Sequence, residues 1–408
     1  MRYSPRPAVT LPALFLLGVG AIYLMLFWAL DGLHGDLWWD EKGFWQTSLM
    51  FSERLVPSLE QLQAYKELNT PLPFILFGLL EHLFQGGIFA GRLLNFGLSL
   101  SMVLWIGWPL RSRRWRAIRS AVGLLLFPYY LWLSGHLYTD IIAAFFALAG
   151  LHCYRQNRSL LSGICFVLGI ASRQYILAFP LGVVAFELFT AYRQKARPPW
   201  QILVPTVAAL SILGWVLLFQ GLAPAASYSA RPAPDVQRTL WAVTPGSGLY
   251  FLSFIGLYFV IPELLLFWRG FSLKTLLLQT ARYRRYAAIA LALLLAFILF
   301  PPALTASGNL IKVARLLPTD GLKILLFYSL ALLACLRFSR PSLACWLLAC
   351  HALIMLKAYQ WDRYALPLLV GLWYLKSVAA LELLDSPLRA SSGSASSLPE
   401  ETCDVRHL

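Results

Sequence analysis

Long apolar stretches recur along nearly the whole chain and constrain its fold more than any other feature. The first of them, Leu11 to Leu30, carries no charged residue. About 20 apolar residues are what an α-helix needs to cross the hydrocarbon core of a bilayer. Hydrophobic residues make up 59% of the 408 residues and charged residues 13%, a balance too apolar for a soluble protein with one large core. We therefore expect an all-α polytopic membrane protein.

The formal net charge of +15 raises the question of nucleic-acid binding. The basic residues, however, lie in short loops between apolar runs, where they set the orientation of membrane helices. No basic domain is present that could follow a phosphate backbone. We expect membrane lipids as partners and no nucleic acid.

Positive charge also predicts the topology. The segment Arg111–Arg119 has five arginines in nine residues and follows the apolar run Gly91–Leu110, so it is expected in the cytoplasm. The amino end, Met1–Pro7, is basic too, which requires an even number of spans between the two. Leu11–Leu30 and Gly91–Leu110 supply two spans, and the shorter run Pro71–Phe84 then becomes an interfacial helix outside. Alternation predicts twelve spans with both ends cytoplasmic, the other ten near residues 120–136, 140–154, 159–171, 175–192, 201–220, 249–268, 287–303, 321–336, 342–357 and 364–381.

This topology predicts one transmembrane domain, residues 1–381, whose first outer loop, residues 31–90, holds interfacial helices. The first apolar run is longer than a signal-peptide core and precedes no small-x-small cleavage motif, so we expect it to be retained as a helix. The carboxyl-terminal residues 382–408 are rich in Ser, Pro and acids and are expected to form a disordered cytoplasmic tail. The six cysteines show neither zinc spacing nor a disulfide framework and are expected to pack as small apolar residues.

Two adjacent acids, Asp40 and Glu41, follow the first span in an aromatic setting. One interpretation is structural, with Asp40 capping an interfacial helix that begins at Glu41. The other is functional, with the pair acting as a general base or a metal ligand at the outer mouth of the helix bundle. The pair alone does not decide between them.

A second acid lies in the motif Tyr138-Thr139-Asp140, where a span is expected to emerge outside and the chain to turn back. Thr139 or Asp140 is expected to cap the next helix, and a carboxylate there can also face a substrate. Arg173 and Gln174 lie between two further spans on the same side. One interpretation of Arg173 is an arginine that snorkels to the membrane interface. If it is buried instead, it needs an anion, either a carboxylate or a phosphate held by its fork of donors.

Three further groups are expected on the outer face. Arg92 and Asn95 begin a span on one helix face, Lys312 lies in an outer loop, and Asp362-Arg363 precedes the last span. An interfacial Asp–Arg pair under an aromatic belt is the simple structural interpretation of the last group. Taken together, acids for proton transfer, arginines for phosphate and aromatics for sugar rings favour transfer from a lipid-phosphate donor, whose departing negative charge cations stabilise.

The motifs resemble those of GT-C type glycosyltransferases, and more narrowly those of the α-1,2-glucosyltransferases that add the terminal glucose to a dolichol-linked oligosaccharide. The similarity covers about the first 190 residues. It consists of five short motifs in the family's order, which are Asp40-Glu41 with Phe44, Thr70-Pro71, Arg92-Leu-Leu-Asn95, Tyr138-Thr139-Asp140 and Arg173-Gln174.

This resemblance implies a GT-C fold and inverting transfer of a hexose from a polyprenyl- or dolichyl-phosphate donor to a glycan or lipid acceptor. It implies Asp40 as the general base, Glu41 as its orienting neighbour and Asp140 as a clamp on the acceptor. The phosphate-binding candidates that it implies are Arg92, Arg173, Arg363 and Lys312, with Asn95, Tyr138 and Gln174 as further binding residues.

The same resemblance implies no cofactor, with a divalent metal left open. The site is expected on the periplasmic side of a bacterial plasma membrane, or on the luminal side of the endoplasmic reticulum in a eukaryote. The alternatives are a mannosyl- or aminoarabinosyl-type transferase of the same superfamily, and a lipid-linked glycan transporter or polymerase. A transporter is expected to carry polar residues at mid-membrane depth.

Overall fold

The computed structural model describes residues 10–109, 113–231, 235–267, 280–305 and 307–381. The predicted tail, residues 382–408, lies outside the described residues. Within the described ranges all regular structure is helical apart from one isolated bridge between Ser307 and Trp361. The predicted all-α class is confirmed.

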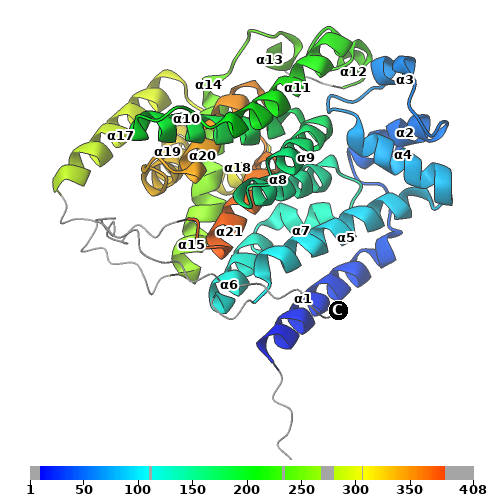
Figure 1. The fold of residues 1–408 in the computed structure, drawn as a ribbon, viewed down its shortest axis with the longest axis horizontal. Helices are drawn as coiled ribbons and strands as arrows, with labels where there is room; N and C mark the ends of the chain where they lie inside the picture. Colours follow the sequence, from blue (N-terminus) through cyan, green and yellow to red (C-terminus); the bar gives the residue numbers. More distant parts are fainter. Residues whose placement is uncertain (1–9, 110–112, 232–234, 268–279, 306, 382–408) are drawn as a thin grey trace, which may run out of the picture.

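The amino-terminal part forms a long helix, a group of short helices and a second long helix. The short ones lie together at one edge of the molecule (Figure 1), where α2 and α4 pack closely. A Cβ atom at Gly78 would lie 2.6 Å from the Ser48 carbonyl oxygen, so glycine allows this close approach. The elements are α1 (Leu11–Ala29), a 3₁₀ turn (Asp31–Leu33), α2 (Glu41–Ser52), α3 (Leu59–Ala64), α4 (Leu72–Phe84) and α5 (Gly87–Gly107).

The middle part forms two helical hairpins that position two of the predicted site motifs. Before them the chain bends by 77° between α6 and α7, where Pro128 begins α7 and cannot donate a helix hydrogen bond. Gly150 of α8 lies against the Phe166 ring of α9, which brings the two helices together. The elements are α6 (Arg114–Leu125), α7 (Pro128–Ser134), α8 (Thr139–Arg155), α9 (Ser159–Ser172), η2 (Gln174–Leu177), α10 (Ala178–Gln194), η3 (Trp200–Ile202) and α11 (Leu203–Phe219).

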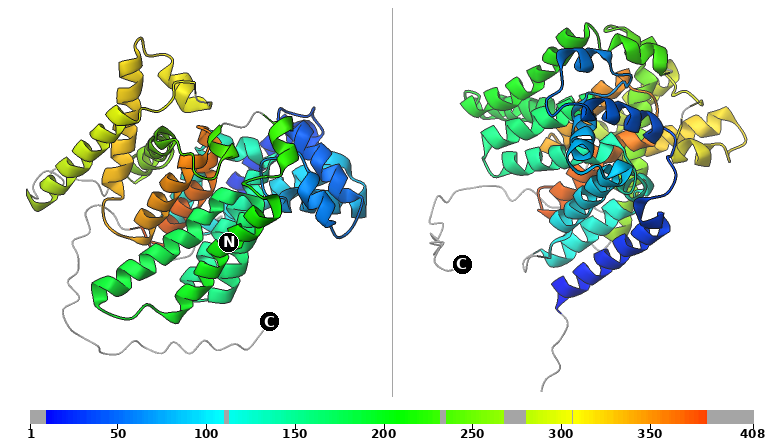
Figure 2. Two further views of the ribbon diagram at one scale, coloured as in Figure 1. Left: turned by 90° about the horizontal axis from the view of Figure 1, so that it is seen from above. Right: turned by 90° about the vertical axis from the view of Figure 1, so that its right-hand side faces the viewer.

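The carboxyl-terminal part supplies the central helix of the bundle. Every residue of α21 from Leu366 to Ser377 is buried, since the helix packs against α6 and α8. At the edge opposite α2–α4 lie α17 and α19, which pack on each other (Figures 1 and 2). The elements are α12 (Ala225–Ala230), α13 (Asp235–Arg238), α14 (Pro245–Ile255), a π-helical turn (Gly256–Val260), α15 (Ile261–Leu266), α17 (Thr280–Leu299), α18 (Asn309–Ala314), α19 (Asp320–Arg337), α20 (Leu343–Ile354), η6 (Met355–Lys357), η7 (Asp362–Ala365) and α21 (Leu366–Ser377).

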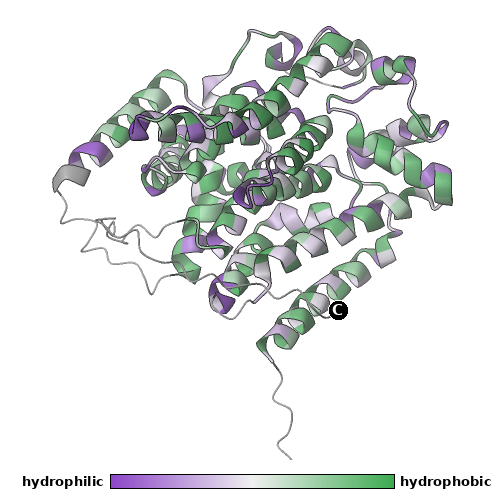
Figure 3. Cartoon of the chain, viewed as in Figure 1, coloured by the Kyte–Doolittle hydropathy of each residue, from purple (hydrophilic) through white to green (hydrophobic). Residues whose placement is uncertain are grey.

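Among the described residues, five helical segments are long and apolar enough to cross a membrane, or six if the bent α6–α7 pair counts as one span. Each of the twelve predicted ranges contains a helix, but several of these helices are short. Leu17, Leu24 and Trp28 of α1 are largely exposed, and Figure 3 colours most of α1 as hydrophobic along its length. Several long apolar helices of this kind indicate a protein embedded in a membrane.

Candidate functional site

Asp40 lies in a tight turn directly before α2. The Glu41 N–H donates to the Trp38 carbonyl at 2.8 Å, and Trp39 between them has a left-handed φ of +43°. The helix begins at Glu41 as predicted, but the Asp40 side chain makes no capping hydrogen bond. The capping interpretation of Asp40 is therefore wrong, and its carboxylate, 29% exposed, is free to face other groups.

Glu41 is fully buried and is bound on all sides. Its carboxylate accepts from Arg92 Nε at 3.0 Å and Nη2 at 2.8 Å, and from the backbone N–H groups of Trp38 at 2.8 Å and Leu137 at 2.5 Å. Because Leu137 lies just before the Tyr138-Thr139-Asp140 motif, Glu41 ties the turn of Asp40 to the turn of Asp140.

The remaining N–H groups of Arg92 donate to backbone carbonyls that precede this turn. It donates to Leu33 at 3.0 Å, Gly35 at 2.6 Å and Asp36 at 3.0 Å. With the two bonds to Glu41, all five N–H donors of the guanidinium are used. The geometry therefore corrects the expectation that Arg92 binds phosphate, because no donor is left for it, and makes Arg92 a structural residue that holds the segment before α2.

Asn95 and Tyr138 fix the start of α8. The Asn95 amide donates to the carbonyls of His136 at 2.7 Å and Tyr138 at 2.8 Å. The Tyr138 ring lies edge-on to Phe44 at 5.5 Å, and the Arg363 guanidinium lies 5.2 Å from its centre. Asn95 thus positions the backbone of the motif, while Tyr138 contacts a predicted site residue directly.

Asp140 and Arg173 form a buried pair. Arg173 Nη2 donates to Asp140 Oδ2 at 2.5 Å and its Nη1 to Asn69 Oδ1 at 2.8 Å, while the Tyr175 hydroxyl donates to Asp140 Oδ1 at 2.9 Å. Helix α8 begins at Thr139 without a side-chain cap, so the expected cap by Thr139 or Asp140 is absent. Burial alone would lower the pKa of Arg173, but Asp140 and Tyr175 outweigh it and raise the pKa.

Arg363 connects Asp40 to this pair. Its Nη2 donates to Asp40 Oδ2 at 3.1 Å, and its guanidinium stacks on Trp361 at 3.7 Å from the ring centre. The Tyr364 ring lies 5.5 Å from the guanidinium of Arg363 and 5.7 Å from that of Arg173. Although burial would lower its pKa, Tyr364, Asp140 and Asp40 raise the pKa of Arg363, so it stays charged.

Three guanidinium nitrogens at this point have no hydrogen-bond partner within the described residues although they are buried. They are Nε and Nη1 of Arg363 and Nε of Arg173. A buried donor without a partner costs about 1–3 kcal/mol, and more on a charged group. An anion that accepted hydrogen bonds from these donors would remove this cost, so such donors indicate a candidate anion-binding place.

Sequence reasoning missed a further acid–arginine pair beside Asp40. Glu67, 4% exposed, accepts from Arg231 Nε at 3.1 Å and also from Arg231 Nη2. Arg231 Nη1 lies 4.0 Å from Asp40 Oδ1. Neither residue lies in a recognisable motif, since both come from irregular segments that the fold brings together. We call Asp40, Glu67, Asp140, Arg173, Arg231 and Arg363 the acid–arginine cluster.

The remaining predicted residues lie at its margin or away from it. The Gln174 amide donates to the carbonyls of Leu68 at 2.7 Å and Leu222 at 3.3 Å, which joins the segments that contain these two residues. Lys312 is exposed on α18, and no contact with the cluster is found for it in the described part of the chain. Asp362 does not pair with Arg363. Its Oδ2 accepts from the Tyr258 hydroxyl at 2.7 Å and from the backbone N–H groups of Asn309 and Leu310 at 2.9 Å each.

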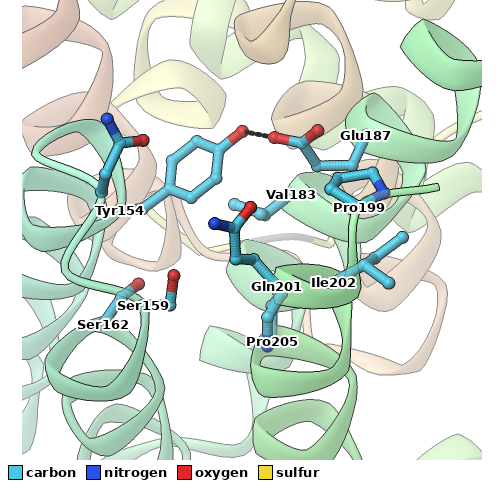
Figure 4. Close-up of a pocket in the computed structure, with 10 residues that line it drawn as sticks. Tyr154, Ser159, Ser162, Val183, Glu187, Pro199, Gln201, Ile202 and Pro205 are labelled. Atoms are coloured by element: carbon cyan, nitrogen blue, oxygen red, sulfur yellow. Dashed lines mark hydrogen bonds between the residues drawn. The ribbon is translucent and has the colours of Figure 1, made fainter.

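Other polar groups lie away from this cluster. A small pocket of about 50 Å³ opens at the far end of α8, where Tyr154 donates to Glu187 (Figure 4). Glu263 is buried against Arg337 at 2.6 and 2.7 Å and Lys376 at 2.5 Å. Among the described residues no group of three or more His, Cys, Asp or Glu side chains could hold a metal ion.

No protein-family model matches the sequence, and neither curated proteins nor solved structures give a match. The resemblance to GT-C glycosyltransferases therefore stays a prediction from the motifs.

Proposed function

We propose that the protein is an integral membrane glycosyltransferase of the GT-C type that moves a hexose from a polyprenyl- or dolichyl-phosphate donor to a glycan or lipid acceptor. The observation that supports this most is the group of guanidinium N–H donors on Arg363 and Arg173 that find no partner among the described residues, beside the partly exposed carboxylate of Asp40. A phosphate would satisfy these donors, and the carboxylate lies next to where that phosphate would bind.

In the proposed reaction Asp40 accepts the proton of an acceptor hydroxyl. The hydroxyl oxygen forms a bond to the anomeric carbon, and the bond from that carbon to the phosphate oxygen breaks. Its electron pair leaves with the lipid phosphate, and the added negative charge is stabilised by Arg363 and Arg173. Attack from the face opposite the phosphate inverts the anomeric configuration.

The proposal includes the twelve-span topology with the acid–arginine cluster on the extracytoplasmic side. A donor anchored in the bilayer suits a cluster near the ends of membrane helices, because the lipid can stay in the membrane while its headgroup reacts. Glu41 and Arg92 take no part in this chemistry. Their role is to hold the turn of Asp40 against the start of α8.

The test is transfer by the purified full chain in lipid nanodiscs, with a panel of polyprenyl-phosphate hexoses and candidate acceptors. Asp40→Asn is expected to lower kcat about 10²- to 10⁴-fold, the usual contribution of a general base. Arg363→Lys keeps the charge but loses the planar fork and is expected to lower transfer about 10- to 100-fold, since hydrogen bonds to charged groups contribute about 1.5–3 kcal/mol.

Arg238→Lys is the matched control, because Arg238 is an exposed arginine of the same outer part of the chain. It should stay within about twofold of the wild type, the effect of a surface substitution. Near-normal turnover of a folded Asp40→Asn protein would remove Asp40 as the base. Absence of transfer from every donor by the wild type would contradict the proposed function.

A further inference from the structure

Arg231 reaches the site from the carboxyl end of α12, and its contacts there are with Glu67. Two N–H groups of its guanidinium, at Nε and Nη2, are bound to the Glu67 carboxylate. The third nitrogen, Nη1, is 4.0 Å from Asp40 Oδ1, which is longer than a hydrogen bond. Arg231 therefore prefers Glu67 over Asp40 although both carboxylates are within reach.

The pair is built into the first turn of α2. A Cβ atom at Gly43 would lie 1.7 Å from Arg231 Nη2 and 2.6 Å from Glu67 Oε1. The ion pair thus rests directly on the backbone three residues after Asp40, at a place where any larger residue would displace it. This close approach fixes the distance between Arg231 and Asp40.

Glu67 is also better placed than Asp40 to hold an arginine. It is almost fully buried, whereas the Asp40 side chain is 29% exposed, and charge-assisted bidentate pairs are the strong ones. Burial raises the pKa of Glu67, while Arg231 opposes that rise. The buried carboxylate and the guanidinium therefore stabilise each other, which strengthens the preference of each for the other.

Asp40 already has one close cation, Arg363 at 3.1 Å. A second arginine in direct contact would stabilise its negative charge further and weaken it as a proton acceptor. In the proposed function the donor phosphate binds Arg363 and so weakens the interaction between Arg363 and Asp40. If Arg231 moved into contact with Asp40, it would replace the interaction that Arg363 had lost.

We propose that Glu67 is a positioning residue that holds Arg231 away from Asp40 and so keeps the Asp40 carboxylate able to accept a proton. The role rests on the proposed function, since it concerns Asp40 as base. It assigns a purpose to Glu67, Gly43 and Arg231 together and gives the segment after α11 a direct link to the reaction.

The experiment compares Glu67→Gln, Arg231→Ala and the double variant in the donor–acceptor pair that wild-type protein uses. Glu67→Gln is expected to lower kcat severalfold, because an arginine in contact with the Asp40 carboxylate makes it a weaker proton acceptor, with the donor KM within about twofold of the wild type. Removing Arg231 in that background is expected to restore at least half of the lost rate on a logarithmic scale. A merely structural role for Glu67 predicts the reverse, a double variant no better than the single.

A second readout needs no transfer. Carbodiimide with a glycine ester labels carboxyl groups that can take up a proton, and mass spectrometry of the peptide reports the labelling of Asp40. Labelling is expected to fall in Glu67→Gln and to recover in the double variant. Unchanged labelling in both, or a double variant that is no better than Glu67→Gln, would overturn the positioning role. A wild type that transfers nothing would instead contradict the proposed function, and the labelling would still decide on Glu67.

Discussion

At the scale of single residues, the structure separates carboxylates that the sequence presents alike. Asp40 and Glu41 are neighbours, yet one is partly exposed beside two arginines and the other is sealed against Arg92. The difference arises because the side chains of adjacent residues at the start of a helix point to different sides. Sequence alone predicts that acids gather here, but not which of them stays accessible.

Asp362 offers a prediction at this scale. It is buried, it accepts hydrogen bonds from Tyr258, Asn309 and Leu310, and its Oδ1 has no partner within the described residues. Burial raises its pKa, and the hydrogen bonds only partly oppose this. The folded state thus binds the proton more tightly than the unfolded state, so the contribution of Asp362 to stability falls as pH rises from its ordinary value towards the raised one.

Asp362→Asn removes that charge and keeps an acceptor for the same donors. The melting temperature of the variant minus that of the wild type is expected to increase between about pH 4 and the raised pKa and then stay constant. The same difference for Asp320→Asn, an exposed carboxylate on α19, is expected to show no such increase. If the difference in melting temperature between Asp362→Asn and the wild type does not change with pH, the ionised Asp362 carboxylate does not destabilise the folded protein.

At the scale of elements, apolar runs predicted most helices, since a run of that length has few other options in a membrane. The helix predicted over residues 71–84 is found as α4 (Leu72–Phe84), while its interfacial position stays a prediction. Contacts between irregular segments were not predictable. Glu67 and Arg231 are 164 residues apart, and neither has a periodic or motif signal, so only the packed fold brings them together. For the same reason the exposed position of Lys312 and the structural use of Arg92 could not be read from their charge.

The Glu41–Arg92 pair joins three elements and should carry much of the stability of the outer part. It links the turn before α2, the first turns of α5 and the turn before α8. Glu41→Gln leaves a buried guanidinium without its counter-charge, which costs about 3–5 kcal/mol. We expect a clear fall in the melting temperature of the purified protein, while Glu53→Gln, exposed at the end of the same helix, should change it little. If Glu41→Gln and the wild type melt at the same temperature, the Glu41–Arg92 pair does not stabilise the fold.

At the scale of the whole molecule, the number of spans depends on helices that are too short to cross a bilayer alone. Helix α21 has 12 residues, or about 18 Å at 1.5 Å per residue, against a hydrocarbon core of about 30 Å. It is buried on every side, so its neighbours rather than lipid surround it. Composition alone cannot tell such a helix from a lipid-facing span, which is why five long helices accompany a prediction of twelve spans.

The sidedness of the molecule can be measured with cysteine labelling. Helix α8 (Thr139–Arg155) contains Asp140 of the acid–arginine cluster in its first turn and ends at Arg155, about 22 Å further along the helix at 1.5 Å per residue. The positive-inside prediction places the exposed Glu53 outside the cell and the exposed Asn157, just after α8, in the cytoplasm. In a background without the six native cysteines, Glu53→Cys should react with a membrane-impermeant maleimide in intact cells. Asn157→Cys should react only after permeabilisation, and the cysteine-free protein should not react at all. Reaction of both cysteines in intact cells, or of Asn157→Cys alone, would reverse or remove the predicted topology and with it the extracytoplasmic position of Asp40.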